Sequence, residues 1–255
     1  MRLIDLSCDL GEASTADEDL VESRLWPLVT SANVACGGHT GDISTMQRAV
    51  ERARTHSVAL GAHPSYPDRV HFGRQRLSIS PSALIDSLVE QVSALAAVAR
   101  ERGLSLAHIK PHGALYNDAH HDRRLAESIV AAVSRLDRKV AIVCGPASAL
   151  FEIGKRAGVT TIAEAFADRR YRPDASLVPR SETDALILDP REAAQQALSL
   201  AAEGKTSTAA GTRIDLVPAT ICIHSDMARS VERLEAIREM LSGAGFGFRS
   251  CGERP

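Results

Sequence analysis

Seven short apolar runs alternate with longer segments of helical period along this chain. Each run is rich in Val, Ile, Leu and Ala, which is typical of strands buried on both faces. Between them, apolar residues return every three or four positions, as in residues 82–103, where Gly103 provides a C-terminal stop. Such alternation predicts βα units, a parallel sheet and right-handed crossovers. The predicted strands are residues 2–9, 30–37, 57–64, 106–113, 139–146, 159–166 and 219–226.

Polar residues favour a closed barrel over an open sheet. In six of the seven runs, chemically capable side chains lie at or just after the C-terminal end of the strand. Loops at that end of a barrel share one mouth, whereas an open sheet concentrates its site at one switch point. We therefore predict a single domain over residues 1–255, an irregular TIM-like (β/α) barrel of about seven parallel strands. The clusters are Asp9 and Glu12; Asn33 and His39; His63 and Asp68; Lys110 and His112; Glu164, Asp168 and Arg169; and His224 and Asp226.

Composition narrows the classes of partner. The 255 residues include 30 basic and 32 acidic side chains without a basic run, so we expect a small-molecule partner and no nucleic acid. The N-terminus MRLIDLSCDLGE lacks a long apolar region, and we expect no membrane span, which needs about 18 apolar residues. The five cysteines form no C-x-x-C pair, which argues against a disulfide framework and a structural zinc site. We expect a cytoplasmic protein with reduced, mostly buried cysteines.

Three histidines follow predicted strands beside turn-forming residues: His63 in GAHP, His112 in KPHG and His224 in CIHSD. A short, rigid support suits a side chain that acts near neutral pH or binds a metal, and imidazole does both. Any one of them could simply hydrogen-bond a loop. Together they indicate an active site.

Lys110 follows a strand that the barrel would bury, so its ammonium must reach the mouth or an acidic partner. It could hold a substrate carboxylate or stabilise a developing oxyanion together with His112. Alternatively, it forms a structural ion pair with Asp9 or Glu12. In the rest of HIKPHGALYN, we expect His108 to be structural and Tyr116 and Asn117 to line the rim.

The carboxyl groups of Asp9 and Glu12 lie on either side of a Gly turn in CDLGE, so both could enter the same mouth. One of them could serve as general base for water. Alternatively, Glu12 satisfies backbone N–H groups at a helix N-terminus. Asp42 is a candidate cap for the helix that begins ISTMQRAV. Arg169 is a plausible clamp for a carboxylate or a phosphate.

Two segments resemble nucleotide-binding motifs but lack residues or elements that those motifs need. The segment EGKTS contains Gly-Lys-Thr, but Ser199 stands where a P-loop needs its first glycine. The segment GAGFGF near the C-terminus has suggestive glycine spacing without a following βαβ unit, and we expect a loop there. Neither segment predicts a phosphate cradle.

Several longer motifs occur in the order seen in one known family: DLSCDLGE, TSANVACGGHTGD, GAHPSYPD, FGR, HIKPHGALYN, EAFADRRY and CIHSD. Over these residues the sequence resembles the LamB/YcsF family, the A subunits of a prokaryotic ATP-dependent 5-oxoprolinase. The resemblance implies an irregular barrel of the glycoside hydrolase/deacetylase kind. It also implies hydrolysis of 5-oxo-L-proline to L-glutamate, coupled to ATP hydrolysis, with partner subunits B and C. Because this chain lacks phosphate loops, we expect ATP, with Mg²⁺, to be bound mainly by the partners.

The resemblance and the clusters together lead to one set of roles. Asp9 or Glu12 would activate water, while Lys110 and His112 would stabilise the oxyanion or the leaving amine. Arg74 or Arg169 would hold the substrate carboxylate, and no metal is firmly predicted. The expected substrate-binding residues are Asn33, His39, His63, Arg74, Tyr116, Asn117, Glu164, Asp168, Arg169, His224 and Asp226.

Two other functions stay open. A metal-dependent amidohydrolase or polysaccharide deacetylase would use Asp9, His63 and His112 as ligands, with His224 as a fourth candidate. This mixed His/Asp set suits zinc. A non-catalytic subunit that delivers a ligand to its partners would also lack a nucleotide loop.

The chain departs from the family pattern at a few positions. Gly38 and Thr40 stand where Phe and Ala are usual, and Gln75 replaces an arginine. Ser225 stands where the family has glycine, so the backbone there must accommodate a Cβ and a hydroxyl.

Overall fold

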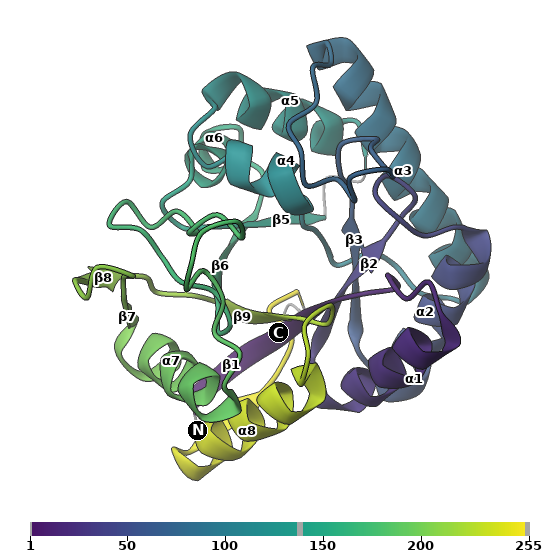
Figure 1. The fold of residues 1–255 in the computed structure, drawn as a ribbon. Coiled ribbons are helices and arrows are strands. Elements are labelled where there is room, and N and C mark those ends of the chain that lie inside the picture. The colour runs from purple at the N-terminus through teal and green to yellow at the C-terminus, as the bar shows by residue number, and fades with distance from the viewer. Residues whose placement is uncertain (1, 137–139, 253–255) are drawn as a thin grey trace.

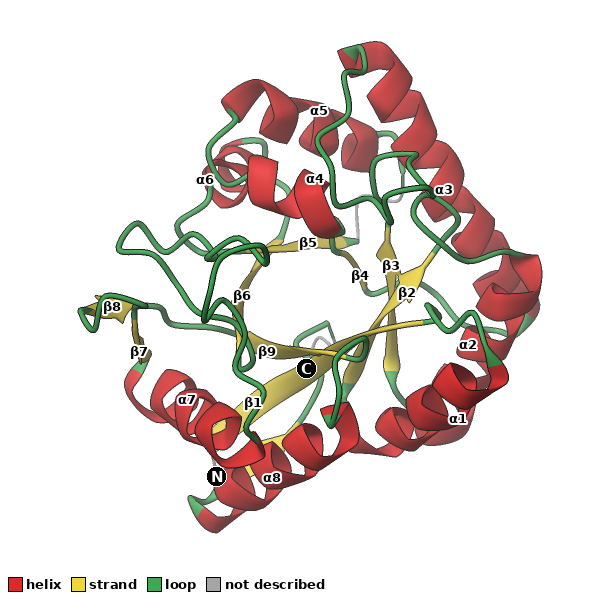
Figure 2. Cartoon of the chain, in the orientation of Figure 1, coloured by secondary structure: helices red, strands yellow, loops and turns green. Residues whose placement is uncertain are grey.

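A closed barrel of seven parallel strands forms the centre of the protein, and helices surround it (Figure 1, Figure 2). The computed structural model describes residues 2–136 and 140–252. Strand β9 pairs with both β6 and β1, which closes the barrel and confirms the predicted fold class. Each predicted run contains one strand; Lys139, the first residue of the fifth run, lies outside the described residues. The barrel strands are β1 (Arg2–Leu10), β2 (Ser31–Ala35), β3 (Ala59–His63), β4 (His108–Ile109), β5 (Ala141–Cys144), β6 (Thr161–Phe166) and β9 (Thr220–His224).

The helices begin and end at local signals in the sequence. Asp42 caps α2, because its carboxylate accepts a hydrogen bond from the backbone N–H of Thr45, as predicted. Helix α3 ends at Glu101, and Gly103 follows it with a φ of +73°. The helices are α1 (Ala16–Leu25), the 3₁₀ turn η1 (Trp26–Leu28), α2 (Ile43–His56), α3 (Pro81–Glu101), α4 (Gly113–Asp118), α5 (Arg123–Ser134), α6 (Ala149–Arg156), α7 (Pro190–Glu203) and α8 (Ser230–Gly243).

Helix α3 is the one helix among the described residues that is long and apolar enough, by length and composition, to cross a membrane. Its buried side chains, including Leu84, Leu88 and Leu95, belong to the main hydrophobic core. A core helix of a globular domain has the same composition, and α3 packs in that way against the barrel.

The two segments that resemble nucleotide-binding motifs, EGKTS and GAGFGF, each contain a short strand. The expected loop in GAGFGF is wrong, because Phe246–Phe248 form β10, which pairs in parallel with the start of β1. The edge of β1 supplies the partner that no local pattern could reveal. In EGKTS, residues Lys205–Ser207 form β7, which pairs with β8 (Arg213–Asp215) outside the barrel.

Polar side chains already occur inside the barrel at the N-terminal half of the strands, where Ser31 donates to Asp5 and Thr220 donates to Ser7. Cys8, Cys36 and Cys222 are buried, as expected of core residues. Near the C-terminal ends of the strands, the register places Asp9 of β1 directly beside Asn33 of β2 and His224 of β9. The functional side chains are therefore carried by rigid strands rather than by mobile loops.

Candidate active site

Asp9 is the centre of a buried hydrogen-bond network at the C-terminal ends of the strands. Its Oδ1 accepts hydrogen bonds from Lys110 Nζ and Asn33 Nδ2, each over 2.8 Å. Its Oδ2 lies 3.3 Å from His63 Nε2 and 3.9 Å from His224 Nε2. Burial alone would raise the pKa of Asp9, but His63 and Lys110 outweigh burial and hold this pKa well below its usual value. Asp9 is therefore an ionised carboxylate at neutral pH.

Asn33 and His108 support Asp9 from inside the barrel. His108 Nε2 donates to Asn33 Oδ1 over 2.7 Å, which orients the amide so that its Nδ2 donates to Asp9. Burial lowers the pKa of His108 to about 3, with Lys110 adding to the effect, so the ring is neutral. His108 thus has the structural role expected for it, and Asn33 positions Asp9.

Lys110 is enclosed within the barrel, with 2% of its surface exposed. Besides Asp9, its Nζ contacts Glu164 Oε1 at 3.0 Å and donates to Cys222 Sγ over 3.1 Å. Burial would lower the pKa of Lys110, but Asp9, Cys222 and Glu164 outweigh burial and raise this pKa well above its usual value. Of the two ion pairs considered, the structure contains the one with Asp9 and not the one with Glu12.

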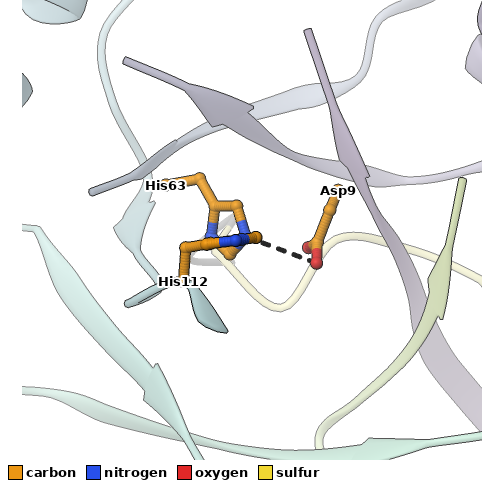
Figure 3. Close-up of side chains that lie close together, drawn as sticks. All are labelled: Asp9, His63 and His112. Atoms are coloured by element: carbon orange, nitrogen blue, oxygen red, sulfur yellow. Dashed lines mark hydrogen bonds and ion pairs between the residues drawn. The ribbon is translucent and has the colours of Figure 1, made fainter. Parts of the chain in front are cut away.

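Two histidines lie next to Asp9, on the side of Oδ2. His63 Nε2 lies 3.0 Å from His112 Nδ1, and the three side chains point toward one another (Figure 3). His112 stacks on His39 with ring centroids 3.7 Å apart, and His39 Nε2 lies 2.9 Å from Glu12 Oε1. Burial lowers the pKa of His39 and of His112, and neighbouring imidazoles lower it further, so both rings are neutral. Asp9–His63–His112 and Glu12–His39–His112 each bring three potential metal ligands together.

Glu12 faces this histidine cluster rather than a helix terminus. Helix α1 begins at Ala16 and is capped by Thr15, so the helix-capping alternative for Glu12 is wrong. Burial raises the pKa of Glu12 to about 8, and the charge of Asp9 adds to the increase. Of the two carboxyl groups considered as bases, Asp9 therefore has a lowered pKa and Glu12 a raised one. The sequence pattern CDLGE did not indicate this difference.

Asp168 orients His224. Its Oδ1 accepts a hydrogen bond from His224 Nδ1 over 3.0 Å, and its Oδ2 accepts one from the His224 backbone N–H over 2.7 Å. Phe166 stacks on the imidazole with ring centroids 5.3 Å apart. Because Asp168 is fully buried, it positions His224 and offers no surface to a substrate.

Arg169 is a buried cation that makes none of the ion pairs found in residues 2–136 and 140–252. Only 3% of its surface is exposed, its Nη2 donates to Val178 O over 2.7 Å, and its Nε has no hydrogen-bond partner. Burial, together with the nearby charge of Arg180, lowers the pKa of Arg169 to about 10. The group remains a cation at neutral pH. A buried cation with an unpaired N–H indicates a binding site for an anion.

Arg74 occupies the mouth of the barrel with its charge already engaged. It pairs with Asp226 Oδ2, and Arg180 Nη1 lies 3.1 Å from the same oxygen. The Arg74 guanidinium also lies over the Phe72 ring. Of the two predicted carboxylate clamps, Arg169 rather than Arg74 has a buried donor without a partner among the described residues.

A cavity of about 290 Å³ opens beside the Asp9 network. Arg74 borders this cavity and two neighbouring ones, while Asn33 and Asp168 line none of the three. Glu164 lines one neighbouring cavity, and Glu12, His39 and Asp226 line the other. The predicted site residues that line the Asp9 cavity are Asp9, His63, Arg74, Lys110, His112, Tyr116, Asn117, Arg169 and His224.

The sequence reasoning missed part of this lining. Phe166, Leu177, Pro179 and Arg180 also line the Asp9 cavity. The last three belong to residues 167–189, which connect β6 to α7 and form an unusually long connection for a βα unit. That length was the available signal, since long loops in compact domains are often functional.

The departures from the family pattern have local explanations. Ser225 donates its hydroxyl to the Asp9 backbone carbonyl over 2.7 Å, so its side chain stabilises the site. A Cβ at Gly38 would lie 2.2 Å from Gln91 Oε1, so a larger residue there requires Gln91 to move. Thr40 lines the neighbouring cavity of Glu12, and Gln75 is exposed.

Comparison with known proteins identifies the family. The model of the LamB/YcsF family matches residues 4–254. The chain belongs to the LamB/YcsF family. Relatives from Chloroflexus aggregans and Chloroflexus aurantiacus, each named as the A subunit of 5-oxoprolinase, are 43% identical over 250 residues and 44% identical over 246 residues. The matched regions cover 98% and 96% of this chain, and 99% and 97% of the relatives.

Solved structures agree with this LamB/YcsF assignment. The lactam utilization protein from Thermus thermophilus has a TM-score of 0.89 and 38% identity, covering 98% of this chain and 99% of that chain. A putative cellobiose-phosphate cleavage protein from Enterococcus faecalis has a TM-score of 0.55 and 12% identity, covering 98% and 97%. The second similarity shows the fold alone.

Proposed function

We propose that this chain is the A subunit of a 5-oxoprolinase, which opens the lactam ring of 5-oxo-L-proline to give L-glutamate in a reaction coupled to ATP hydrolysis. The names of the full-length relatives and of the Thermus structure support this assignment. The observation that carries it is the buried, unpaired Arg169 in the same cavity as Asp9, His63 and His112. Such a cavity suits a small molecule with a carboxylate at one end and an amide at the other.

Arg169 binds the substrate carboxylate in this proposal. Its guanidinium is already desolvated, so an incoming carboxylate gains a strong charge-assisted hydrogen bond without having to strip water from the arginine. Its Nε has no hydrogen-bond partner among the described residues, whereas the charge of Arg74 is engaged by Asp226. The carboxylate of 5-oxo-L-proline thereby sets the orientation of the ring.

The amide end of the substrate lies against Asp9, His63 and His112, where water is activated for attack on the carbonyl carbon. Ring opening adds the water oxygen to this carbon, breaks the C–N bond and leaves a proton on the nitrogen. The contacts revise two of the roles expected from the sequence. Lys110 balances Asp9 and Glu164, so it acts as a positioning residue. His112 donates a hydrogen bond from its Nε2 to Phe72 O over 3.0 Å, so its Nδ1, which faces His63, accepts rather than donates.

Lactam hydrolysis needs coupling, because closure of glutamate is favoured by the high effective concentration of its own amine. The described residues do not fit an ATP site of the P-loop kind. Gly204 ends α7, Lys205 pairs with Asp215 at 3.5 Å, and a strand follows instead of the helix N-terminus that cradles phosphate. We therefore assign ATP and Mg²⁺ to partner subunits B and C, and ring opening to this chain. All five cysteines are unpaired, which supports a cytoplasmic location.

The test combines this chain with subunits B and C, ATP and 5-oxo-L-proline and follows glutamate release. The decisive variant is Arg169→Gln, which removes the cation. Loss of one partner of a buried charge pair costs about 2–5 kcal/mol, which corresponds to a KM for 5-oxo-L-proline at least about 30-fold higher. Arg169→Lys restores the charge but not the planar guanidinium, so we expect only partial recovery. Arg170→Gln is the matched control, because Arg170 pairs with Glu192 and does not line the cavity.

Two results would overturn the assignment. No glutamate from the wild-type mixture, with subunits B and C shown to be folded, would remove the lactamase function. An unchanged KM in Arg169→Gln would remove the carboxylate role of Arg169. The non-catalytic alternative is distinguished by Asp9→Asn, which lowers kcat if this chain performs ring opening and leaves kcat unchanged if it only delivers substrate.

A further inference from the structure

The hydrogen bonds of His63 and His112 determine which nitrogen of each ring carries the proton. His63 Nδ1 lies 2.7 Å from Lys110 O, and His112 Nε2 lies 3.0 Å from Phe72 O. A carbonyl oxygen can only accept a hydrogen bond, so each of these two nitrogens carries a proton and donates to the carbonyl. His63 Nε2 and His112 Nδ1 are therefore the two ring nitrogens left to bind a further ligand.

These two nitrogens lie next to each other and next to a carboxylate oxygen. His63 Nε2 lies 3.0 Å from His112 Nδ1 and 3.3 Å from Asp9 Oδ2 (Figure 3). With His112 Nδ1 and Asp9, this nitrogen completes a group of three potential metal ligands whose atoms all lie within 4.8 Å of one another. Zinc bound at about 2.0–2.2 Å by tetrahedral N and O ligands leaves those ligands roughly 3.3 Å apart. The separations of 3.0 Å and 3.3 Å from His63 Nε2 are close to this value.

We propose that Asp9, His63 and His112 form a binding site for a divalent first-row transition metal, for which zinc is the best-matched ion. Two neutral imidazoles and one carboxylate are a donor set that suits zinc. The site lines the Asp9 cavity and uses three protein ligands, which leaves a further coordination position for a small ligand. Lactam binding in that cavity would then bring the amide next to the metal.

The groups around the ligands hold them in the orientation that metal binding needs. Backbone carbonyls hold both imidazoles, as is usual for metal-bound histidines. Asn33 and Lys110 both donate to Asp9 Oδ1, so Oδ2 is left toward the histidines. On the far side of Asp9, His224 has the same arrangement: Asp168 holds its Nδ1, and its Nε2 faces Asp9 Oδ2 at 3.9 Å. His224 is thus the nearest candidate for a fourth ligand.

The experiment uses full-length protein without a histidine tag, stripped of metal by a chelator and titrated with Zn²⁺ by calorimetry. We expect one zinc per chain, confirmed by elemental analysis after dialysis, and a Co²⁺ derivative with the visible absorption of a low-coordinate site. Loss of an outer-shell partner weakens metal binding roughly 10- to 100-fold, so loss of a ligand in His63→Gln or His112→Gln should weaken it by more. His56→Gln is the matched control, because His56 is exposed at the end of α2.

Folding is controlled separately from metal binding. Each variant is checked by circular dichroism, and zinc should raise the melting temperature of the wild type but not of His63→Gln or His112→Gln. Asp9→Asn provides a third, nearly isosteric variant with the same expected loss. Zinc bound well below one equivalent by folded wild type would mean that a proton occupies the space between the rings, and would overturn the proposal. Unchanged affinity in both histidine variants would place the ion elsewhere, with the same consequence. Neither measurement needs substrate or partner subunits, so the result is independent of the proposed lactam chemistry.

Discussion

Replacing Lys110 by methionine removes a cation that lies between two buried carboxylates, Asp9 and Glu164. Methionine keeps most of the length and volume of the lysine stem, so the change is mainly one of charge. In the variant, the two carboxylates lose their shared counter-ion although only 4% of Asp9 and 1% of Glu164 is exposed. We expect a folded but much less stable protein that releases no glutamate.

The size of the effect follows from the two distances, 2.8 Å to Asp9 and 3.0 Å to Glu164. At an effective dielectric constant of about 20, each contact contributes about 6 kcal/mol of Coulomb attraction. The desolvation of the charged groups offsets much of this attraction, and removing one partner of a buried pair has a net cost of about 3–5 kcal/mol. A domain of ordinary stability, about 5–15 kcal/mol, survives such a loss only narrowly.

Urea denaturation measures this loss directly. Trp26 is the single tryptophan of the chain and is fully buried, so its fluorescence reports unfolding. We expect a lower midpoint for Lys110→Met at an unchanged m value. Adding Glu164→Gln removes the second charge and should restore much of the stability, but not the activity, because Asp9 still lacks its support. Lys155→Met, an exposed change on α6, should stay within about 0.5 kcal/mol of wild type.

Two outcomes would refute this reasoning. The first is a Lys110→Met variant that loses no more than about 1 kcal/mol, the value of a surface pair. The second is a double variant no more stable than the single one. Either result would mean that Lys110 does not act as the counter-ion of Asp9 and Glu164.

The remaining predictions concern the supports of the site. Burial raises the pKa of Asp5, although hydrogen bonds from Thr30 and others oppose this increase. Asp5 therefore favours the folded state most below its unfolded pKa of 3.8. This contribution to stability is lost as the pH rises through the higher pKa of the folded state. Asp5→Asn should therefore be more stable than wild type near pH 8, with a smaller advantage near pH 5, in urea titrations at about these two values; a pH-independent difference would contradict this. A Cβ at Gly61 would lie 2.0 Å from His108 Nε2, so Gly61→Ala should lose about 1–3 kcal/mol, while the helical Gly243→Ala, with open space around it, should not. Equal midpoints for the two glycine variants would show that His108 can move freely.

The order of strands and helices was predictable because it depends on local periodicity. Each apolar run contained a barrel strand, and nine of the predicted site residues line one cavity at the C-terminal ends of the strands. The C-terminal strand β10 was missed because its stability comes from the edge of β1 rather than from its own residues. The connection from β6 to α7 was missed as a site wall because its lining residues follow no periodic pattern.

The sequence by itself determined the barrel and the set of chemically capable residues at its mouth, because periodicity and the parallel βα order dictate where strand ends lie. Only the tertiary structure decided what each residue can do. Closure of β9 against β1 brings together groups from distant segments, so Lys110 gains two counter-ions while Arg169 gains none. Likewise, Phe72 O and Lys110 O determine the proton positions on His112 and His63, and no local pattern contains that information. Charge balance and proton position depend on contacts across the barrel, and those contacts exist only after the chain has folded.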